Sequence, residues 1–127
     1  MNDLGYFVII HPDASIELVE TPGGAEEIHR LVGGFFENVY LPDFPVSDVV
    51  ASVNEVGKFI GLPINPFATY IYGSYADFIV GDFVIQKLDR FGDLNELDQV
   101  PFTDDEAKVI VDLLKMYKKR WLIEEDL

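Results

Sequence analysis

The sequence predicts an α+β domain: a small mixed or antiparallel sheet with a short helix and a long amphipathic C-terminal helix packed on it. Three observations indicate this class. Short β-branched and aromatic runs are bounded by proline and glycine, as strands are. An apolar stripe of helical spacing follows a capping sequence at residue 103. The 127 residues, 49% of them hydrophobic, match one domain with its own core. We therefore expect a single domain over 1–127, with residues 122–127 frayed.

The first forty residues predict a hairpin, a helix and a further strand. Residues 6–10 are aromatic and β-branched, a proline-containing turn follows, and residues 15–19 return as a second strand. Residues 25–32 predict a short helix, because their apolar side chains recur at helical spacing and two acids occupy the first turn. Gly33 ends this helix, since glycine adopts the left-handed conformation at low cost. Residues 35–41 predict the next strand.

The segment 46–60 predicts a second hairpin. Its two apolar runs, 46–53 and 58–60, are separated by a turn that ends in Gly57. Two such runs joined by a short glycine-containing connection are typical of a hairpin with a bulged turn.

Residues 61–86 predict a less regular region. An irregular segment leads into residues 67–72, which we expect to form a short helix. Residues 77–86 predict either two short strand pieces or one strand with a kink at Gly81, because glycine in a strand often marks a bend.

The C-terminal helix has the strongest local signal. Thr103 and Glu106 form a capping box, in which each side chain pairs with an amide that the first turn leaves free. One apolar stripe at 3-4-3-4 spacing then predicts packing on the sheet. The stripe consists of Ala107, Ile110, Leu114, Tyr117 and Trp121. The basic side chains of the last turns suit the negative end of the helix dipole.

Composition excludes several functions. The chain has no cysteine, which rules out disulfides, thiolate metal sites and cysteine nucleophiles. Its net charge of −14 disfavours direct nucleic-acid binding and favours a partner with a basic surface. The start of the sequence lacks the basic residues of a signal peptide, and no apolar run is long enough to cross a membrane. We expect a cytoplasmic protein without membrane contact; its oligomeric state is left open.

Catalytic and metal-binding patterns are missing from the sequence. His11 and His29 are isolated and lack the i, i+4 partner of a helical metal site. The acidic residues of 89–98 fail the register of a calcium loop, because the twelfth position is Val100 rather than glutamate. Phosphate-binding glycine loops and nucleophile elbows are also absent. We therefore expect no enzyme activity, no cofactor and no metal.

Four short motifs follow one another in an order that is similar to a known family. They are LVGGF at 31–35, NEVGK at 54–58, GLPIN at 61–65 and IVGDFVI at 79–85. This succession resembles the DUF3846 family, small proteins associated with phages, plasmids and conjugative elements. The resemblance implies a mobile-element setting and supplies no known activity. Members tend to carry basic residues after the asparagine of the third motif, whereas this chain has Pro66, so an anion-binding role is not expected here.

The resemblance points to the segment 54–65 as a binding surface. The candidate binding residues are Asn54, Glu55, Gly57, Lys58, Gly61, Leu62, Pro63 and Asn65. A purely structural interpretation stays open, in which Gly57 shapes a turn and Asn65 caps a helix.

Two functional classes remain. The first is an accessory protein of a phage or plasmid that binds a host protein through its acidic surface; a DNA mimic is one version, and it requires the acids to line up on one face. The second is a small-ligand module in which the loops of 54–65 close over a nucleotide or metabolite. Four aromatic residues could then form pocket walls, or could equally belong to the core: Phe67, Tyr70, Tyr72 and Tyr75.

Overall fold

The computed structural model describes residues 4–73, 77–89 and 98–125. The strands among them are β1 (Gly5–Ile10), β2 (Ile16–Thr21), β3 (Phe36–Tyr40), β4 (Val49–Asn54), β5 (Phe83–Asp89) and β6 (Asp98–Val100). The helices among them are α1 (Ala25–Val32), α2 (Pro66–Tyr72) and α3 (Asp104–Glu125).

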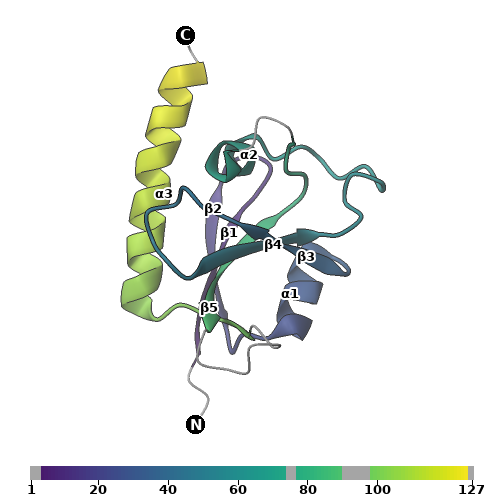
Figure 1. Cartoon of the computed structure of the whole chain (residues 1–127), viewed down its shortest axis with the longest axis vertical. Helices are drawn as coiled ribbons and strands as arrows, with labels where there is room; N and C mark the ends of the chain where they lie inside the picture. The colour runs from purple at the N-terminus through teal and green to yellow at the C-terminus, as the bar shows by residue number, and fades with distance from the viewer. Residues whose placement is uncertain (1–3, 74–76, 90–97, 126–127) are drawn as a thin grey trace.

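One antiparallel sheet organises the described chain. Its strands lie in the order β2-β1-β5-β4-β3, and the short β6 pairs with the end of β5. The N-terminal hairpin is confirmed, with Ile10 opposite Ile16 at the turn. Strands β2 and β3 form the two ends of this order, so each pairs with a neighbour on one side only. Figure 1 shows the sheet between α1 on one side and α3 on the other.

Helices cover both faces of the sheet because side chains along a strand alternate between its faces. On one face, Val8 and Ile85 pack against Leu114 of α3, and Phe67 of α2 joins the same core. On the opposite face, Phe7 and Val84 pack against α1. The expected α+β architecture, a sheet carrying a short helix and a long C-terminal helix, is confirmed.

Helix α3 begins as the capping box predicts. The backbone N–H of Thr103 donates to Glu106 Oε1 at 3.0 Å, and the N–H of Glu106 donates to Thr103 Oγ1 at 3.2 Å. Along the predicted stripe, Ala107, Ile110 and Leu114 are buried, and Tyr117 and Trp121 are partly buried against the core. The helix continues through Glu125, and its last turns project beyond the rest of the molecule (Figure 1).

The predicted hairpin over 46–60 is wrong. Strand β4 begins at Val49 and pairs with β3 on one side and β5 on the other, so both of its edges are occupied. Residues 55–61 form successive turns instead of a return strand. The apolar residues Phe59 and Ile60 misled the prediction, because their side chains are exposed and do not contribute to the sheet.

The region around Gly81 matches the alternative of two strand pieces. Val80 forms an isolated bridge with Ile64, and β5 starts only at Phe83. Gly81 between them has a φ of 71°, in the left-handed region that breaks a strand. Among the described residues, no helix has the length and apolar character that crossing a bilayer requires.

Candidate functional site

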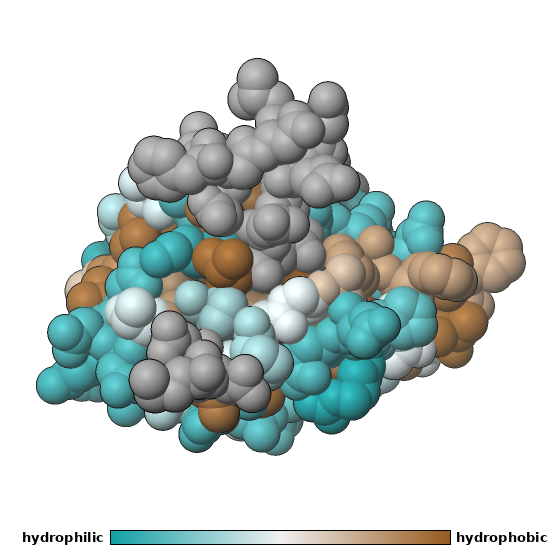
Figure 2. Space-filling view, turned by 90° about the horizontal axis from the view of Figure 1, so that it is seen from below, coloured by the Kyte–Doolittle hydropathy of each residue, from teal (hydrophilic) through white to brown (hydrophobic). Residues whose placement is uncertain are grey.

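The loop between β4 and α2 projects from one edge of the molecule and carries exposed apolar side chains. We call residues 55–64 the apolar loop. Phe59 is 95% exposed and Ile60 is 60% exposed, and Val56 and Ile64 are also exposed. Figure 1 shows this teal loop at the right of the molecule, and Figure 2 shows brown and tan side chains gathered at the same edge. Side chains of this size are rarely so exposed without a partner, particularly as a group.

Backbone hydrogen bonds give the apolar loop a defined shape. The N–H of Phe59 donates to the Val56 carbonyl at 2.9 Å, and the N–H of Ile60 donates to the same carbonyl at 3.0 Å. The N–H of Leu62 donates to the Gly57 carbonyl at 3.0 Å. The loop therefore presents Phe59 and Ile60 on a structured turn rather than on an extended connection.

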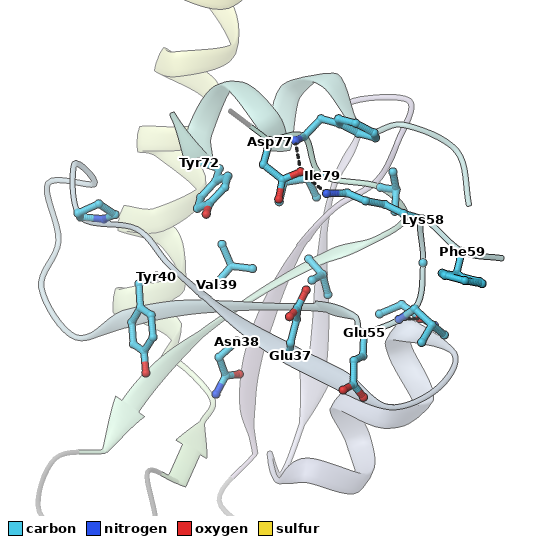
Figure 3. Close-up of a pocket in the computed structure, with 17 residues that line it drawn as sticks. Glu37, Asn38, Val39, Tyr40, Glu55, Lys58, Phe59, Tyr72, Asp77 and Ile79 are labelled. Atoms are coloured by element: carbon cyan, nitrogen blue, oxygen red, sulfur yellow. Dashed lines mark hydrogen bonds and ion pairs between the residues drawn. The ribbon is translucent and has the colours of Figure 1, made fainter. Parts of the chain in front are cut away.

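A groove of about 560 Å³ adjoins the apolar loop. It lies between the β3–β4 ribbon on one side and the end of α2 with residues 77–80 on the other. Figure 3 shows Val39 and Tyr72 facing each other across it, with Tyr40 at one end and Lys58 at the other. Val39, Val53 and Ile79 provide apolar surface within the groove.

The charged groups of the groove are mainly acidic. Lys58 forms an ion pair with Asp77, and its Nζ lies 4.6 Å from the ring centroid of Phe78. The hydrogen bond from Lys58, together with one from the Phe78 N–H, holds the pKa of the Asp77 carboxyl below its usual value. Glu37 and Glu55 also line the groove. Because the one lysine of the lining is paired, the groove favours cationic or neutral groups over anions.

The eight candidate binding residues fall into two groups: those whose side chains are exposed in the groove, and those that hold the apolar loop and the fold in place. Glu55 and Lys58 are exposed and line the groove. Asn54 borders the groove but is itself buried: its Nδ2 donates to the Val32 carbonyl at 3.1 Å, and its Oδ1 accepts from the Val56 N–H at 2.9 Å. Asn54 therefore shapes the start of the apolar loop.

Asn65 is a structural residue at the centre of the fold. Its side chain is fully buried, and its Nδ2 donates to the carbonyls of Ile10 and Gly81, each at 2.8 Å. Its Oδ1 accepts from the Ala68 N–H at 3.2 Å and so caps α2. One amide side chain thus joins the end of β1, the strand bend at Gly81 and the start of α2.

The remaining candidates form the base of the apolar loop. A Cβ on Gly57 would lie 2.9 Å from Val80 Cγ2, so any other residue here would have to displace the Val80 side chain. Gly61 has a φ of 75°, which glycine adopts readily. Leu62 packs over Gly81, and the carbonyl of Pro63 accepts from the Gly81 N–H at 2.8 Å. These residues hold the loop in place.

The four aromatic residues considered as pocket walls do not act together. Tyr72 lines the groove. Phe67 is fully buried and stacks on Trp121 with ring centroids 5.4 Å apart, so a role for it as a pocket wall is wrong. The hydroxyl of Tyr70 donates to Glu124 Oε1 on α3 at 3.3 Å. Tyr75 lies outside the described residues.

The sequence prediction missed an ionic cluster around His11. Its Nδ1 lies 2.7 Å from Asp82 Oδ1 and its Nε2 lies 2.7 Å from Glu17 Oε1. Burial lowers the pKa of His11, but the hydrogen bonds with Glu17 and Asp82 outweigh it and the pKa is raised. No local signal predicts this contact, because Asp82 is 71 positions from His11. His29 makes an edge-to-face contact with Phe35 instead.

Among the described residues, no group of three or more histidine and carboxylate side chains is arranged to hold a metal ion. Most of the acidic segment 89–98 lies outside the described residues. The residues that sequence analysis missed in the groove are mainly Glu37, Tyr40 and Asp77. They come from β3 and from the segment after α2, so only the fold brings them together with Lys58.

Comparison with known proteins gives one match. The model of a family described as a domain of unknown function, DUF3846, matches residues 5–113. Searches of curated proteins and of solved structures found no match.

Proposed function

The chain belongs to the DUF3846 family, and from this premise we propose that it acts by binding another protein through the apolar loop and the acidic rim of the adjoining groove. The observation that carries the proposal is the exposure of Phe59 at the tip of a structured loop. Large aromatic side chains in this position typically anchor protein interfaces, where they fill a pocket of the partner.

The charge of the chain supports a partner with a basic surface. Glu37, Glu55 and Asp77 line the groove that adjoins Phe59, and the whole chain carries −14. A partner that fits both features has an apolar pocket ringed by lysine and arginine side chains. Long-range attraction between the acidic chain and this ring would speed association and weaken with added salt.

DNA mimicry is less well supported than this mode of binding. A mimic needs carboxylates aligned on one face. Among the described residues, acidic side chains lie on both edge strands, with Glu20 on β2 and Glu37 on β3, and on helices that cover opposite faces, with Glu26 on α1 and Asp112 on α3. Such a distribution supports general attraction of a basic partner.

The proposed setting follows from the resemblance described above. In a phage or plasmid, a small protein of this kind would act in the host cytoplasm on a host protein. The proposal includes no cofactor and no catalytic step: the ion pair of the groove joins an ammonium group to a carboxylate, which suits recognition rather than nucleophilic chemistry.

The test compares Phe59→Ala with a matched variant on the opposite edge of the sheet. Leu18 on β2 is also exposed and apolar, so Leu18→Ala controls for loss of surface hydrophobicity. Tagged chains are incubated with host lysate at two salt concentrations and bound proteins are quantified by mass spectrometry. We expect one protein that wild type and Leu18→Ala retain, that Phe59→Ala loses, and that high salt reduces. Equal retention by Phe59→Ala would overturn the proposal.

A second function, small-ligand binding, is supported by the groove itself. Its volume of about 560 Å³ lies within the range of ligand pockets, and its surface combines apolar side chains with Tyr40 and Tyr72. The excess of carboxylates disfavours nucleotides and favours a cationic metabolite. Calorimetry with aromatic and aliphatic amines tests this alternative; loss of binding in Tyr72→Ala would support it, and the absence of heat with any amine would contradict it.

A further inference from the structure

One end of the groove holds a cation that the chain itself supplies. The Lys58 ammonium pairs with Asp77 Oδ1 and lies 4.6 Å from the ring centroid of Phe78. A carboxylate and the face of an aromatic ring both attract positive charge. We call Asp77 and Phe78 together the cation seat. The Lys58 and Asp77 side chains are each about half exposed, so a group from outside the chain can reach the seat.

Lys58 leaves part of the cation seat unused. The two hydrogen bonds of the Asp77 side chain, from Lys58 and from the Phe78 N–H, both go to Oδ1. No group among the described residues donates to the other carboxylate oxygen, Oδ2. An ammonium group makes a single-point contact, whereas a guanidinium group has parallel N–H groups that reach both oxygens of one carboxylate. The seat therefore suits arginine better than the lysine that occupies it.

The walls of the groove fit the rest of an arginine side chain. Val39, Val53 and Ile79 provide apolar surface, and Tyr72 lies across the groove from Val39. Figure 3 shows Asp77 on the same side of the groove, between Tyr72 and Lys58. Arginine packs its aliphatic stem on apolar surface and stacks its planar head on aromatic rings. A side chain that enters along these walls can place its charged head at Asp77.

The position of the cation seat indicates where the arginine comes from. Lys58 precedes Phe59 in the chain, so a partner that holds the Phe59 ring in a pocket brings its own surface next to the seat. Glu37 and Glu55 line the same groove, and Lys58 is the one basic residue of the lining among the described residues. The surroundings of the seat therefore favour a basic group of the partner.

We propose that Lys58 is a built-in competitor at the cation seat, and that an arginine side chain of the partner displaces it on binding. The inference rests on the proposed function, because it places this arginine beside the pocket that holds Phe59. Displacement exchanges one exposed ion pair for another, so only a cation that makes more contacts than Lys58 gains from the exchange. Lys58 thereby selects arginine over lysine at this position of the partner.

The first experiment needs no partner protein. Arginine with an acetylated amino group and an amidated carboxyl group is titrated into the ¹⁵N-labelled chain at low salt. The Phe78 N–H, which donates to Asp77, reports occupation of the seat through its chemical shift. We expect saturable binding with a Kd on the order of 10 mM, as a few charge-assisted hydrogen bonds provide. Citrulline blocked in the same way has nearly the same shape without the charge. Equal shifts with the two compounds would overturn the proposal.

Two lysine variants separate competition at the seat from the net charge of the chain. Lys58→Met and Lys108→Met, an exposed position on α3, each remove one positive charge. We expect blocked arginine to bind Lys58→Met about three- to fivefold more tightly than wild type, the effect of one exposed ion pair, and Lys108→Met as it binds wild type. Asp77→Asn keeps the shape of the seat and should weaken binding by about fivefold or more. Unchanged or weaker binding to Lys58→Met would contradict the role of Lys58 as a competitor.

The last experiment separates this inference from the proposed function. The tagged chain with its retained host protein is washed with blocked arginine or, at the same concentration and ionic strength, with blocked lysine. We expect blocked arginine to release more of the host protein, and Lys58→Met to retain more of it than wild type does. Equal release by both compounds, from a protein whose retention still requires Phe59, would overturn the exchange and leave the proposed function intact. Binding of blocked arginine without any retained host protein would contradict the proposed function and, with it, the partner as the source of the arginine.

Discussion

His11 Nδ1 lies 2.7 Å from Asp82 Oδ1, which joins the turn after β1 to the residue that precedes β5. The other ring nitrogen of His11 lies 2.7 Å from Glu17 Oε1. Both carboxylates act as acceptors, and only the protonated imidazole can donate from both nitrogens. The folded state therefore stabilises the protonated form of the His11 side chain, in agreement with the raised pKa of His11.

The raised pKa predicts a pH dependence of stability. The pKa of His11 is higher in the folded state than in the unfolded state. The stabilisation that protonated His11 gives the fold is therefore complete below its unfolded-state pKa of 6.5, and it is lost as pH rises through its folded-state pKa. We expect the free energy of unfolding to fall by about 0.5–1 kcal/mol above neutral pH, the range for partly exposed ion pairs. Urea unfolding of wild type and His11→Gln across this range measures the effect. We expect this decrease in the free energy of unfolding to disappear in His11→Gln and to persist in His29→Gln. If His11→Gln shows the same decrease as wild type, other groups cause the pH dependence.

Asn65 predicts a large loss of stability from a small change. Asn65→Ala leaves the carbonyls of Ile10 and Gly81 and the N–H of Ala68 without their partner, at a cost of about 3 kcal/mol or more. Asn65→Asp separates the two roles of the side chain, since aspartate caps helices as well as asparagine does but donates no hydrogen bond. We expect Asn65→Asp to be at least as unstable as Asn65→Ala in urea unfolding. A neutral Asn65→Asp would mean that only the cap matters.

We expect the substitution of glycine by alanine to destabilise the fold by different amounts at two positions with similar backbone angles. Gly61 and Gly81 have φ angles of 75° and 71°. A Cβ at Gly61 meets nothing within 4 Å, so Gly61→Ala costs only the backbone strain, about 1–2 kcal/mol. A Cβ at Gly81 lies 2.9 Å from Leu62 Cδ1, so Gly81→Ala costs more. A double-mutant cycle with Leu62→Ala measures the clash. Additive losses for Gly81→Ala and Leu62→Ala would show that the two side chains do not compete.

Two phenylalanines predict opposite outcomes for the same substitution. Phe67 is fully buried against Trp121, so Phe67→Ala is expected to cost about 3–5 kcal/mol and to change the emission of this single tryptophan. Phe59 is exposed, so Phe59→Ala changes the free energy of unfolding by less than about 0.5 kcal/mol. Chemical unfolding followed by tryptophan fluorescence compares the two. A Phe59→Ala variant as unstable as Phe67→Ala would place the Phe59 side chain in the core instead of on the surface of the apolar loop.

Local interactions explain what the sequence could predict. The capping box of α3, the glycine that ends α1 and the apolar stripe of α3 all involve residues within one or two helical turns of one another. The N-terminal hairpin is equally local, with Ile10 and Ile16 paired across a short turn. For such elements the spacing of residue types is sufficient, because the interacting groups are neighbours in the chain.

The wrong prediction of a hairpin over 46–60 shows what the spacing of apolar residues cannot determine. An apolar run such as 58–60 reads alike whether its side chains enter the core or project from a loop. The difference was decided by β5, which pairs with β4 and leaves no edge for a returning strand.

The candidate site depends still more on tertiary structure. The family resemblance points to the segment 54–65, which includes Glu55 and Lys58, but the sequence does not distinguish these two residues from Asn54 and Asn65, which stabilise the fold. Asp77 and Glu37 join Lys58 only through the sheet and the segment after α2. Composition, charge and helix signals are local properties that the sequence determines by itself; which apolar side chains stay exposed, and which distant charges meet, is decided only when the strands pair and exclude water between them.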